Sequence, residues 1–183
     1  PYTFSVGLPG ATDIKYSKMV AEHIGSIHHE IILTEEKMLE AIDRVIYNIE
    51  SYDTTTVRAS TPMLLLCEYI KRETDITVVY SGEGSDEASG SYLYFHNAPD
   101  DESFRKETIR LLEDLQYFDV LRCDKSISGA GLEARVPFLD REFLDFYMAI
   151  PPRYKRPHDG MEKYLLRKGF DFDDLLPSAV LWR

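Results

Sequence analysis

The sequence predicts an α/β protein in which a partial parallel sheet is covered by helices and a helical half follows. Up to Tyr80 the segments follow the order strand, helix, strand, helix, loop, helix, strand, which implies right-handed crossovers between parallel strands. From Ser103 onward the chain has helical periodicity and no convincing strand. With 183 residues, 44% of them hydrophobic, the chain can form one domain with a real core and a small second lobe.

The first strand is expected at Tyr2–Gly7, a β-rich run that ends in glycine. A helix should follow, capped by Thr12 or Asp13 and running to about Ile24. Gly25 then ends the helix, because glycine tolerates the left-handed conformation of a helix C-terminus.

The second strand is expected at Ile27–Leu33, and its apolar end, Ile31-Ile32-Leu33, indicates burial on both faces. Thr34 should cap the next helix. That helix has an apolar stripe at helical spacing. The stripe consists of Met38, Ile42, Val45 and Ile49.

The segment 51–60 is Thr-rich and is expected to be a polar connection. A third helix with Pro62 in its first turn and a strand at Thr77–Tyr80 complete the α/β part. Further helices are expected in the second half, with a mixed segment between the first two of them. The helices are 104–118, 141–150 and 161–170, and the mixed segment is 119–131.

The stretch Ser81–Glu87 is the strongest candidate for a ligand loop. An apolar run ends there in small residues, followed by the acids Glu83, Asp86 and Glu87. Small residues let a ligand approach the backbone, and carboxylates can hold Mg²⁺ or an amine. Ligands of open α/β sheets bind at the carboxyl ends of strands. The spacing alone also fits an ordinary turn followed by a helix cap.

Composition narrows the classes of partner. The net charge of −11 opposes binding to nucleic acid or to an anionic membrane surface, and no apolar run approaches the roughly 20 residues that span a bilayer. The isolated cysteines Cys67 and Cys123 indicate a reducing compartment, which we take to be the cytoplasm. The five histidines lack metal-ligand spacing with cysteine. Because the chain begins with Pro1 rather than Met, we expect a fragment of a longer protein.

Five sequence motifs, in this order along the chain, resemble those of the synthetase domain of glutamine-hydrolysing asparagine synthetases. The motifs are YDTTTVRAS (52–60), SGEGSDE (81–87), YLYFH (92–96), GLEARVPFLD (131–140) and MEKYLLR (161–167). Five long motifs at compatible spacing are hard to obtain by chance, and the resemblance runs from Tyr2 to Arg183.

The resemblance implies an adenine-nucleotide α-hydrolase (ATP-pyrophosphatase) fold, with residues 1–102 as its α/β nucleotide-binding part and 103–183 as its helical part. It also implies a reaction with ATP and Mg²⁺, in which the aspartate side-chain carboxylate becomes β-aspartyl-AMP and pyrophosphate leaves. Ammonia from a separate glutaminase domain, absent here, then displaces AMP to give asparagine. The full-length protein is a candidate homodimer.

The resemblance assigns roles to residues of the loop and of the first strand. Val6 is expected to contact adenine through its backbone, and Ser81 and Gly82 to contact ATP. Glu83 matches the family residue that is important for forming the acyl-adenylate. A carboxylate there can also orient the attacking ammonia or accept its proton. Asp86 is the expected Mg²⁺ ligand.

Two residues of the second half are expected to line the same site. Asp119 and Arg122 lie three apart on a helix face, where they can form an ion pair, and the resemblance makes them catalytic-site residues. Two further sets are expected to support loops. Asp53, Thr55 and Arg58 are candidate loop anchors or aspartate contacts, and Glu133, Arg135 and Asp140 are a candidate buried polar network.

The sequence also departs from the family pattern. After Glu87 the family has a large apolar residue and then a Gly-Tyr pair, where this chain has Ala88-Ser89-Gly90-Ser91-Tyr92. The family's Ser-Gly-Gly-x-Asp-Ser pyrophosphate loop is expected before Pro1, and a lysine segment that contacts pyrophosphate is expected after Arg183. The isolated 183 residues are therefore expected to lack synthetase activity and to bind ATP weakly at best.

Two alternatives remain open from the sequence. One is a β-lactam-synthetase-like ligase, which shares this domain and closes a ring without using ammonia. The other is a truncated copy that does not catalyse a reaction and serves as a nucleotide-binding or interaction module.

Overall fold

The computed structural model describes residues 1–183, which divide into two compact units. The first unit contains residues 1–79, 122–134 and 171–183, and the second contains residues 80–121 and 135–170. The division of the synthetase domain at residue 102 into an α/β part and a helical part stays a prediction. The secondary structure is mixed α/β with many helices, as the sequence predicts, but the strands form two separate two-stranded sheets and not one partial sheet.

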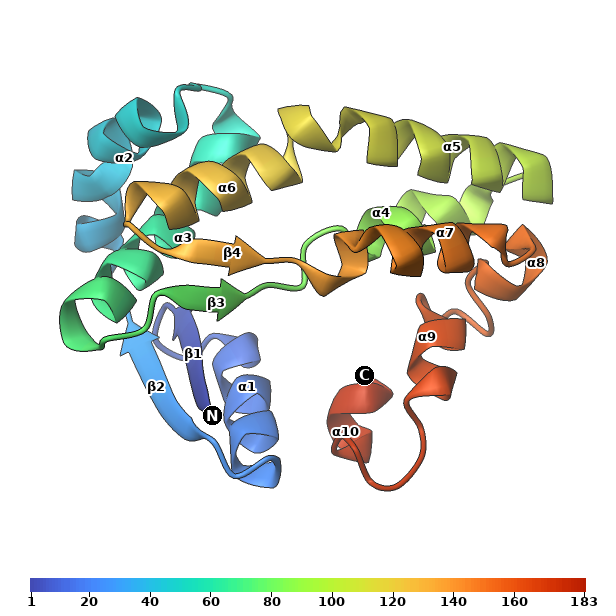
Figure 1. The fold of residues 1–183 in the computed structure, drawn as a ribbon, viewed down its shortest axis with the longest axis horizontal. Helices are drawn as coiled ribbons and strands as arrows, with labels where there is room; N and C mark the ends of the chain where they lie inside the picture. Colours follow the sequence, from blue (N-terminus) through green and yellow to red (C-terminus); the bar gives the residue numbers. More distant parts are fainter. The chain divides into compact units, whose positions relative to one another are not determined.

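The first unit begins with two parallel strands joined by a helix (Figure 1). Strand β1 (Tyr2–Gly7) pairs in register with β2 (Ile27–Ile32), and α1 (Thr12–His23) connects them and packs on them. These elements confirm the predicted order. The predicted side-chain cap is wrong, because Ala11 occupies the N-cap position and makes no capping bond through its side chain. Gly25 follows the helix with φ +64°, as predicted for a C-terminal glycine.

Burial of β2 differs from the prediction. Leu33, directly after the strand, is buried, but Ile27 and Ile32 are exposed, with 42% of Ile32 accessible. The sheet has only two strands, so both strands are edges and β2 is not covered on both faces.

Helices α2 (Glu35–Ile49) and α3 (Thr54–Glu73) pack together in the same unit. Their shared core consists of Ala41, Val45, Ile49 and Leu64. The Thr34 hydroxyl accepts a hydrogen bond from the Lys37 N–H at 3.3 Å, which confirms the predicted cap of α2.

Helix α3 begins earlier than the sequence predicts. Asp53 Oδ1 accepts hydrogen bonds from both the N–H and the hydroxyl of Thr56 at 2.8 Å, so the Thr-rich segment forms the first turns of the helix. Thr56 and Ser60 are buried there. Threonine has low intrinsic helix propensity, and the cap and the burial override it. Pro62 consequently lies inside the helix, not in its first turn.

A second two-stranded sheet pairs β3 (Val78–Tyr80) with β4 (Glu133–Arg135), and the two arrows run in the same direction (Figure 1). The Glu133 N–H donates to the Thr77 carbonyl at 2.7 Å, and the Ser81 N–H donates to the Arg135 carbonyl at 2.9 Å. The prediction of no strand after Ser103 is therefore wrong. Three residues without a β-branched side chain carry no strand pattern, and only the backbone ladder reveals β4.

The remaining regular elements are helices. Helix α6 (Asp119–Gly129) begins in the second unit and continues in the first, and replaces the predicted mixed segment. The other α-helices are α4 (Ser85–Ser89), α5 (Asp101–Asp114), α7 (Arg141–Ala149), α8 (Pro152–Lys155), α9 (Tyr164–Gly169) and α10 (Ser178–Leu181). The 3₁₀ helices are η1 (Leu93–Asn97), η2 (Leu115–Tyr117) and η3 (Pro137–Leu139). None of these helices combines the length with the apolar character that a membrane span requires.

The residues that follow Glu87 pack into the core of the second unit. Phe95 and Phe104 are fully buried, with ring centroids 5.0 Å apart. Gly90 has φ +60°, and a Cβ atom there would lie 2.4 Å from the Phe104 ring. Ala88 and Ser89 are also buried, so the small residues of this chain occupy a packed region.

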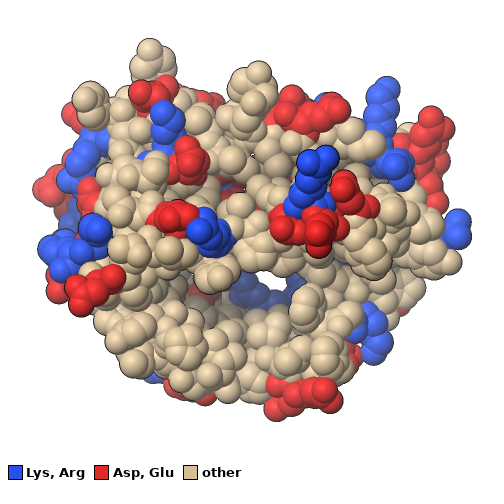
Figure 2. All heavy atoms as spheres, in the orientation of Figure 1, with Lys and Arg blue, Asp and Glu red and all other residues tan.

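Charged side chains of both signs are scattered over a mainly uncharged face (Figure 2). On the face drawn in Figure 2, Lys and Arg are interspersed with Asp and Glu.

Candidate functional site

The Ser81–Glu87 loop leaves β3 and turns at once into α4. Gly84 holds the turn with φ +85°, and a Cβ atom there would lie 2.2 Å from the Leu139 side chain. A side chain at Gly84 would therefore suffer both backbone strain and a clash. Gly82 is different, because a Cβ atom built on it would meet nothing within 4 Å. The backbone at Gly82 is thus open to a ligand.

Asp86 lies in a small polar cluster whose cation comes from a distant part of the chain. The Lys163 ammonium lies 2.9 Å from Asp86 Oδ1 and donates to the Ser85 hydroxyl oxygen at 3.0 Å. The Ser91 hydroxyl donates to the same Oδ1 atom. Neither side chain is fully buried, since 22% of Lys163 and 47% of Asp86 is accessible. The cluster can therefore meet a ligand from solvent.

Lys163 is the functional candidate that sequence reasoning missed. Its signal was present, since Lys163 is the lysine of the motif MEKYLLR. That motif does not reveal that the side chain returns to Asp86, because the contact is made by the tertiary fold.

Next to Asp86 in the chain, Glu87 is only 3% exposed and belongs to a group of neighbouring acids. The Tyr92 hydroxyl donates to the Glu87 carboxylate and lies 3.4 Å from Asp119 Oδ2. Burial is the main cause that raises the pKa of Glu87, and the neighbouring Asp119 carboxyl adds to it against the lowering effect of the Tyr92 hydrogen bond. Burial likewise raises the pKa of the Tyr92 phenol. The structure thus brings the predicted residue Asp119 close to the loop, through Tyr92 and Glu87.

The remaining site predictions are distributed between the two units. Ser81, Gly82, Glu83, Asp86 and Asp119 belong to the second unit. Val6 and Arg122 belong to the first unit, where Val6 pairs with Ile31 in the sheet and Arg122 lies on α6.

Asp53 proves to be a structural anchor, because its carboxylate caps α3. The Thr56 backbone N–H is the main cause that lowers the Asp53 pKa. Asp140 likewise caps α7 by accepting from the Phe143 N–H at 3.1 Å. The predicted burial of Glu133, Arg135 and Asp140 is wrong, because all three residues are exposed. Arg135 supports the loop through its backbone carbonyl, which accepts from the Ser81 N–H.

Metal binding can be tested against the donor set. No group of three or more His, Cys, Asp or Glu side chains could hold a metal ion by itself. Mg²⁺ is usually held by one or two carboxylates together with substrate phosphates and water. Ser91 and Lys163 both contact the Asp86 carboxylate at Oδ1, so Asp86 fits a single Mg²⁺ ligand of this kind through Oδ2.

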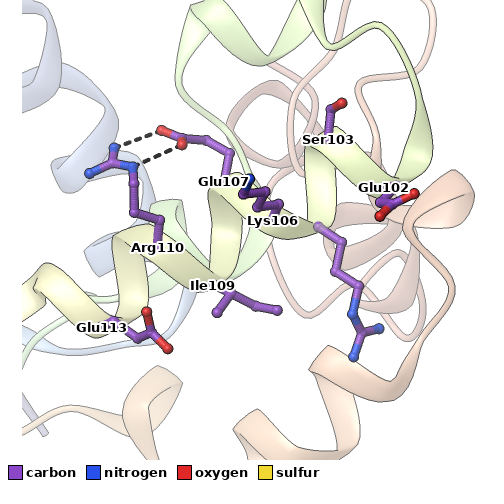
Figure 3. Close-up of a pocket in the computed structure, with 8 residues that line it drawn as sticks. Glu102, Ser103, Lys106, Glu107, Ile109, Arg110 and Glu113 are labelled. Carbon is purple, nitrogen blue, oxygen red and sulfur yellow. Dashed lines mark hydrogen bonds and ion pairs between the residues drawn. The ribbon is translucent and has the colours of Figure 1, made fainter.

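Two hollows are lined by other residues. One, of about 580 Å³, runs along α5, and its lining residues carry both signs of charge (Figure 3). In it Arg110 is turned onto Glu107 through two hydrogen bonds of 2.9 and 2.7 Å. The other, of about 410 Å³, is an apolar groove between α2 and α3 that includes Leu39, Tyr52 and Arg58. Neither contains the loop residues.

Fold and loop together define a mixed α/β chain in which a strand opens into an acidic loop, with a lysine ammonium beside its aspartate. The family model described as asparagine synthase matches residues 2–104 and 97–183. The chain belongs to this family, which confirms the resemblance read from the sequence.

Asparagine synthetases described as glutamine-hydrolysing are similar to the chain along nearly all of its length. The protein of Gallus gallus is 48% identical, that of Rattus norvegicus 47% and that of Homo sapiens 46%, in each case over 181 residues and 99% of this chain. The chain spans about a third of the length of these relatives, 32% in each case.

Proposed function

We propose that these residues are part of the synthetase portion of a longer, glutamine-hydrolysing asparagine synthetase that uses ATP, aspartate and ammonia derived from glutamine. The observation that supports this most is the identity of 46–48% across 99% of the chain to proteins of that description. We further propose the ATP-pyrophosphatase type of fold, a glutaminase domain elsewhere in the parent protein, a cytoplasmic location and a homodimeric parent.

The nucleotide is proposed to bind through backbone and small side chains. Val6 offers amide groups at the end of β1 for the adenine edge, and Ser81 offers a hydroxyl for a ribose or phosphate oxygen. Gly82 permits close approach, because no atom lies within 4 Å of the place where its Cβ would be. These contacts fix the position of the nucleotide.

Charged side chains in and around the loop are proposed to bind the phosphates and the substrate carboxylate. Asp86 would hold Mg²⁺, which supplies charge neutralisation at the phosphate oxygens when it is bound. Lys163 places a second positive charge beside it, and an ammonium that already contacts Ser85 and Asp86 is suited to an anionic ligand oxygen. Arg122 can bind the substrate carboxylate through a guanidinium fork.

The reaction then follows from ordinary acyl-transfer chemistry. An oxygen of the aspartate side-chain carboxylate attacks the α-phosphorus of ATP, and the bond to the leaving pyrophosphate breaks. The ammonia nitrogen next attacks the acyl carbon, the carbon–oxygen bond to AMP breaks, and nitrogen loses a proton. Glu83 is proposed to act in forming the acyl-adenylate and then to accept that proton or to orient the ammonia, and Asp119 to line the same site.

The test is aspartate-dependent exchange of labelled pyrophosphate into ATP by the full-length parent protein. We expect exchange in the native protein and its loss in the Glu83→Ala variant. Glu113→Ala, on the α5 hollow, is the matched control and should exchange at the native rate. No exchange by the native protein would overturn the proposed function, and normal exchange by Glu83→Ala would rule out the role of Glu83.

A further inference from the structure

The backbone of Lys163 has a conformation that its residue type disfavours. Its φ of +56° and ψ of 25° lie in the left-handed region, directly before α9 begins at Tyr164. Non-glycine residues adopt this region rarely, and such a conformation persists where surrounding contacts hold it. The contacts that hold this backbone conformation therefore also fix the position of the Lys163 ammonium at Asp86.

Two side chains act on Glu162, the residue before Lys163. His96 Nε2 pairs with the Glu162 carboxylate. Arg167 Nε donates to the Glu162 carbonyl at 2.9 Å, and the Arg167 N–H donates to the Lys163 carbonyl at 2.8 Å. The Arg167 contacts are local to the turn and its helix, whereas His96 comes from a different element.

His96 is firmly anchored. It lies on η1 (Leu93–Asn97) directly after Phe95, whose fully buried ring packs on Phe104. The His96–Glu162 pair thus connects the core of the second unit to the turn that carries Lys163. The pair is partly shielded, with 31% of the His96 and 25% of the Glu162 side chain accessible.

We propose that His96 is a positioning residue that acts through Glu162 to hold Lys163 in its left-handed conformation, with the ammonium at Asp86 and Ser85. The proposal rests on the proposed function, because it assigns Lys163 to the adenylation site. Without the pair, the turn can relax to commoner backbone angles, and the ammonium then leaves the loop. His96 itself has no contact with Asp86 or Ser85.

The test is a double-mutant cycle in the full-length parent, measured by aspartate-dependent pyrophosphate exchange. His96→Ala should lower the maximal exchange rate about tenfold and change the KM for ATP less, because a hydrogen bond to a charged group is about that strong. His96→Gln should recover part of the rate, since its amide can still donate to Glu162. Arg110→Gln, which removes two surface ion pairs on α5 and no contact of Glu162 or Lys163, is the control with a native rate.

The decisive measurement is the effect of His96→Ala on the exchange rate in the Lys163→Ala background. If His96 acts through Lys163, His96→Ala has no further effect there, whereas a general loss of folding lowers the rate in both backgrounds. If pyrophosphate exchange by Lys163→Ala is too slow to measure, the rate of amide hydrogen–deuterium exchange across 158–167 gives a second measurement. That amide exchange rate should rise in His96→Ala and stay native in Arg110→Gln.

The outcomes separate the two proposals. A native protein without aspartate-dependent exchange refutes the proposed function. A native protein with exchange, in which His96→Ala lowers the rate equally in both backgrounds or leaves the 158–167 amides as protected as before, refutes the positioning role of His96.

Discussion

Replacement of Lys155 by methionine is expected to raise the free energy of unfolding at neutral pH. Lys155 is only 2% exposed, and no carboxylate pairs with it. Its ammonium donates to the Tyr147 carbonyl at 3.2 Å, lies 3.6 Å from the Met148 sulfur and sits 5.2 Å from the Tyr147 ring centroid. One carbonyl and one ring replace little of the hydration that an ammonium loses on burial.

The magnitude follows from the pKa of Lys155. Burial is the main cause that lowers it from 10.5 to about 8, and the nearby Arg105 guanidinium lowers it further. A difference of that size between folded and unfolded chain corresponds to about 3 kcal/mol. The full penalty applies below pH 8, where both states carry the charge. Methionine avoids it, so we expect a gain of about 1–3 kcal/mol at pH 7.

The same pKa predicts a pH dependence whose sign is fixed. Between about pH 8 and 10.5 the unfolded chain binds a proton at Lys155 that the folded chain has released. The free energy of unfolding therefore rises with pH across this interval. In Lys155→Met this rise is absent, so the stability advantage of the variant should shrink as the pH approaches 10.5.

Urea unfolding of the native protein and of Lys155→Met at pH 7 and pH 10 measures this difference, because titrations common to both proteins cancel. The exposed Lys106→Met on α5 is the control, with an expected change within about 0.5 kcal/mol. A Lys155→Met variant that is less stable at pH 7, or an advantage that is equal at both pH values, would refute the reasoning.

Two further predictions concern the loop. Gly84→Ala should lower the free energy of unfolding by about 2–4 kcal/mol, because left-handed strain adds to the Leu139 clash, whereas Gly82→Ala should change it by less than about 0.5 kcal/mol. Equal destabilisation in urea titrations would contradict this. Burial raises the pKa of Glu87 in the folded chain. As the pH rises above the ordinary carboxyl pKa, the unfolded chain loses this proton before the folded chain does, so the free energy of unfolding falls. Glu87→Gln should remove this fall, seen as a flatter midpoint–pH curve than that of the exposed control Glu113→Gln; parallel curves would contradict it.

Sequence pattern was reliable where local signals agree. The apolar stripe ending in Val45 and Ile49 predicted α2, and the same residues are fully buried in the structure. Thr34 and Gly25 marked helix boundaries correctly, because caps depend on a few neighbouring backbone groups. The pattern failed where tertiary contacts decide. The early start of α3 depends on burial of Thr56 and Ser60, and β4 depends on pairing with a strand more than fifty residues earlier.

The site shows the same dependence on tertiary contacts, because two errors there have one cause. Periodicity predicts a helix from Met161, but α9 begins at Tyr164, since Lys163 has left-handed angles. Sequence reasoning also gave Lys163 no role. In a continuous helix Lys163 would follow the local helix surface. The left-handed turn, held at Glu162 by His96 and Arg167, instead carries its ammonium to Asp86. The interrupted helix and the cation beside the acidic loop are therefore one feature, and a variant that restores the helix at Lys163 should lose both.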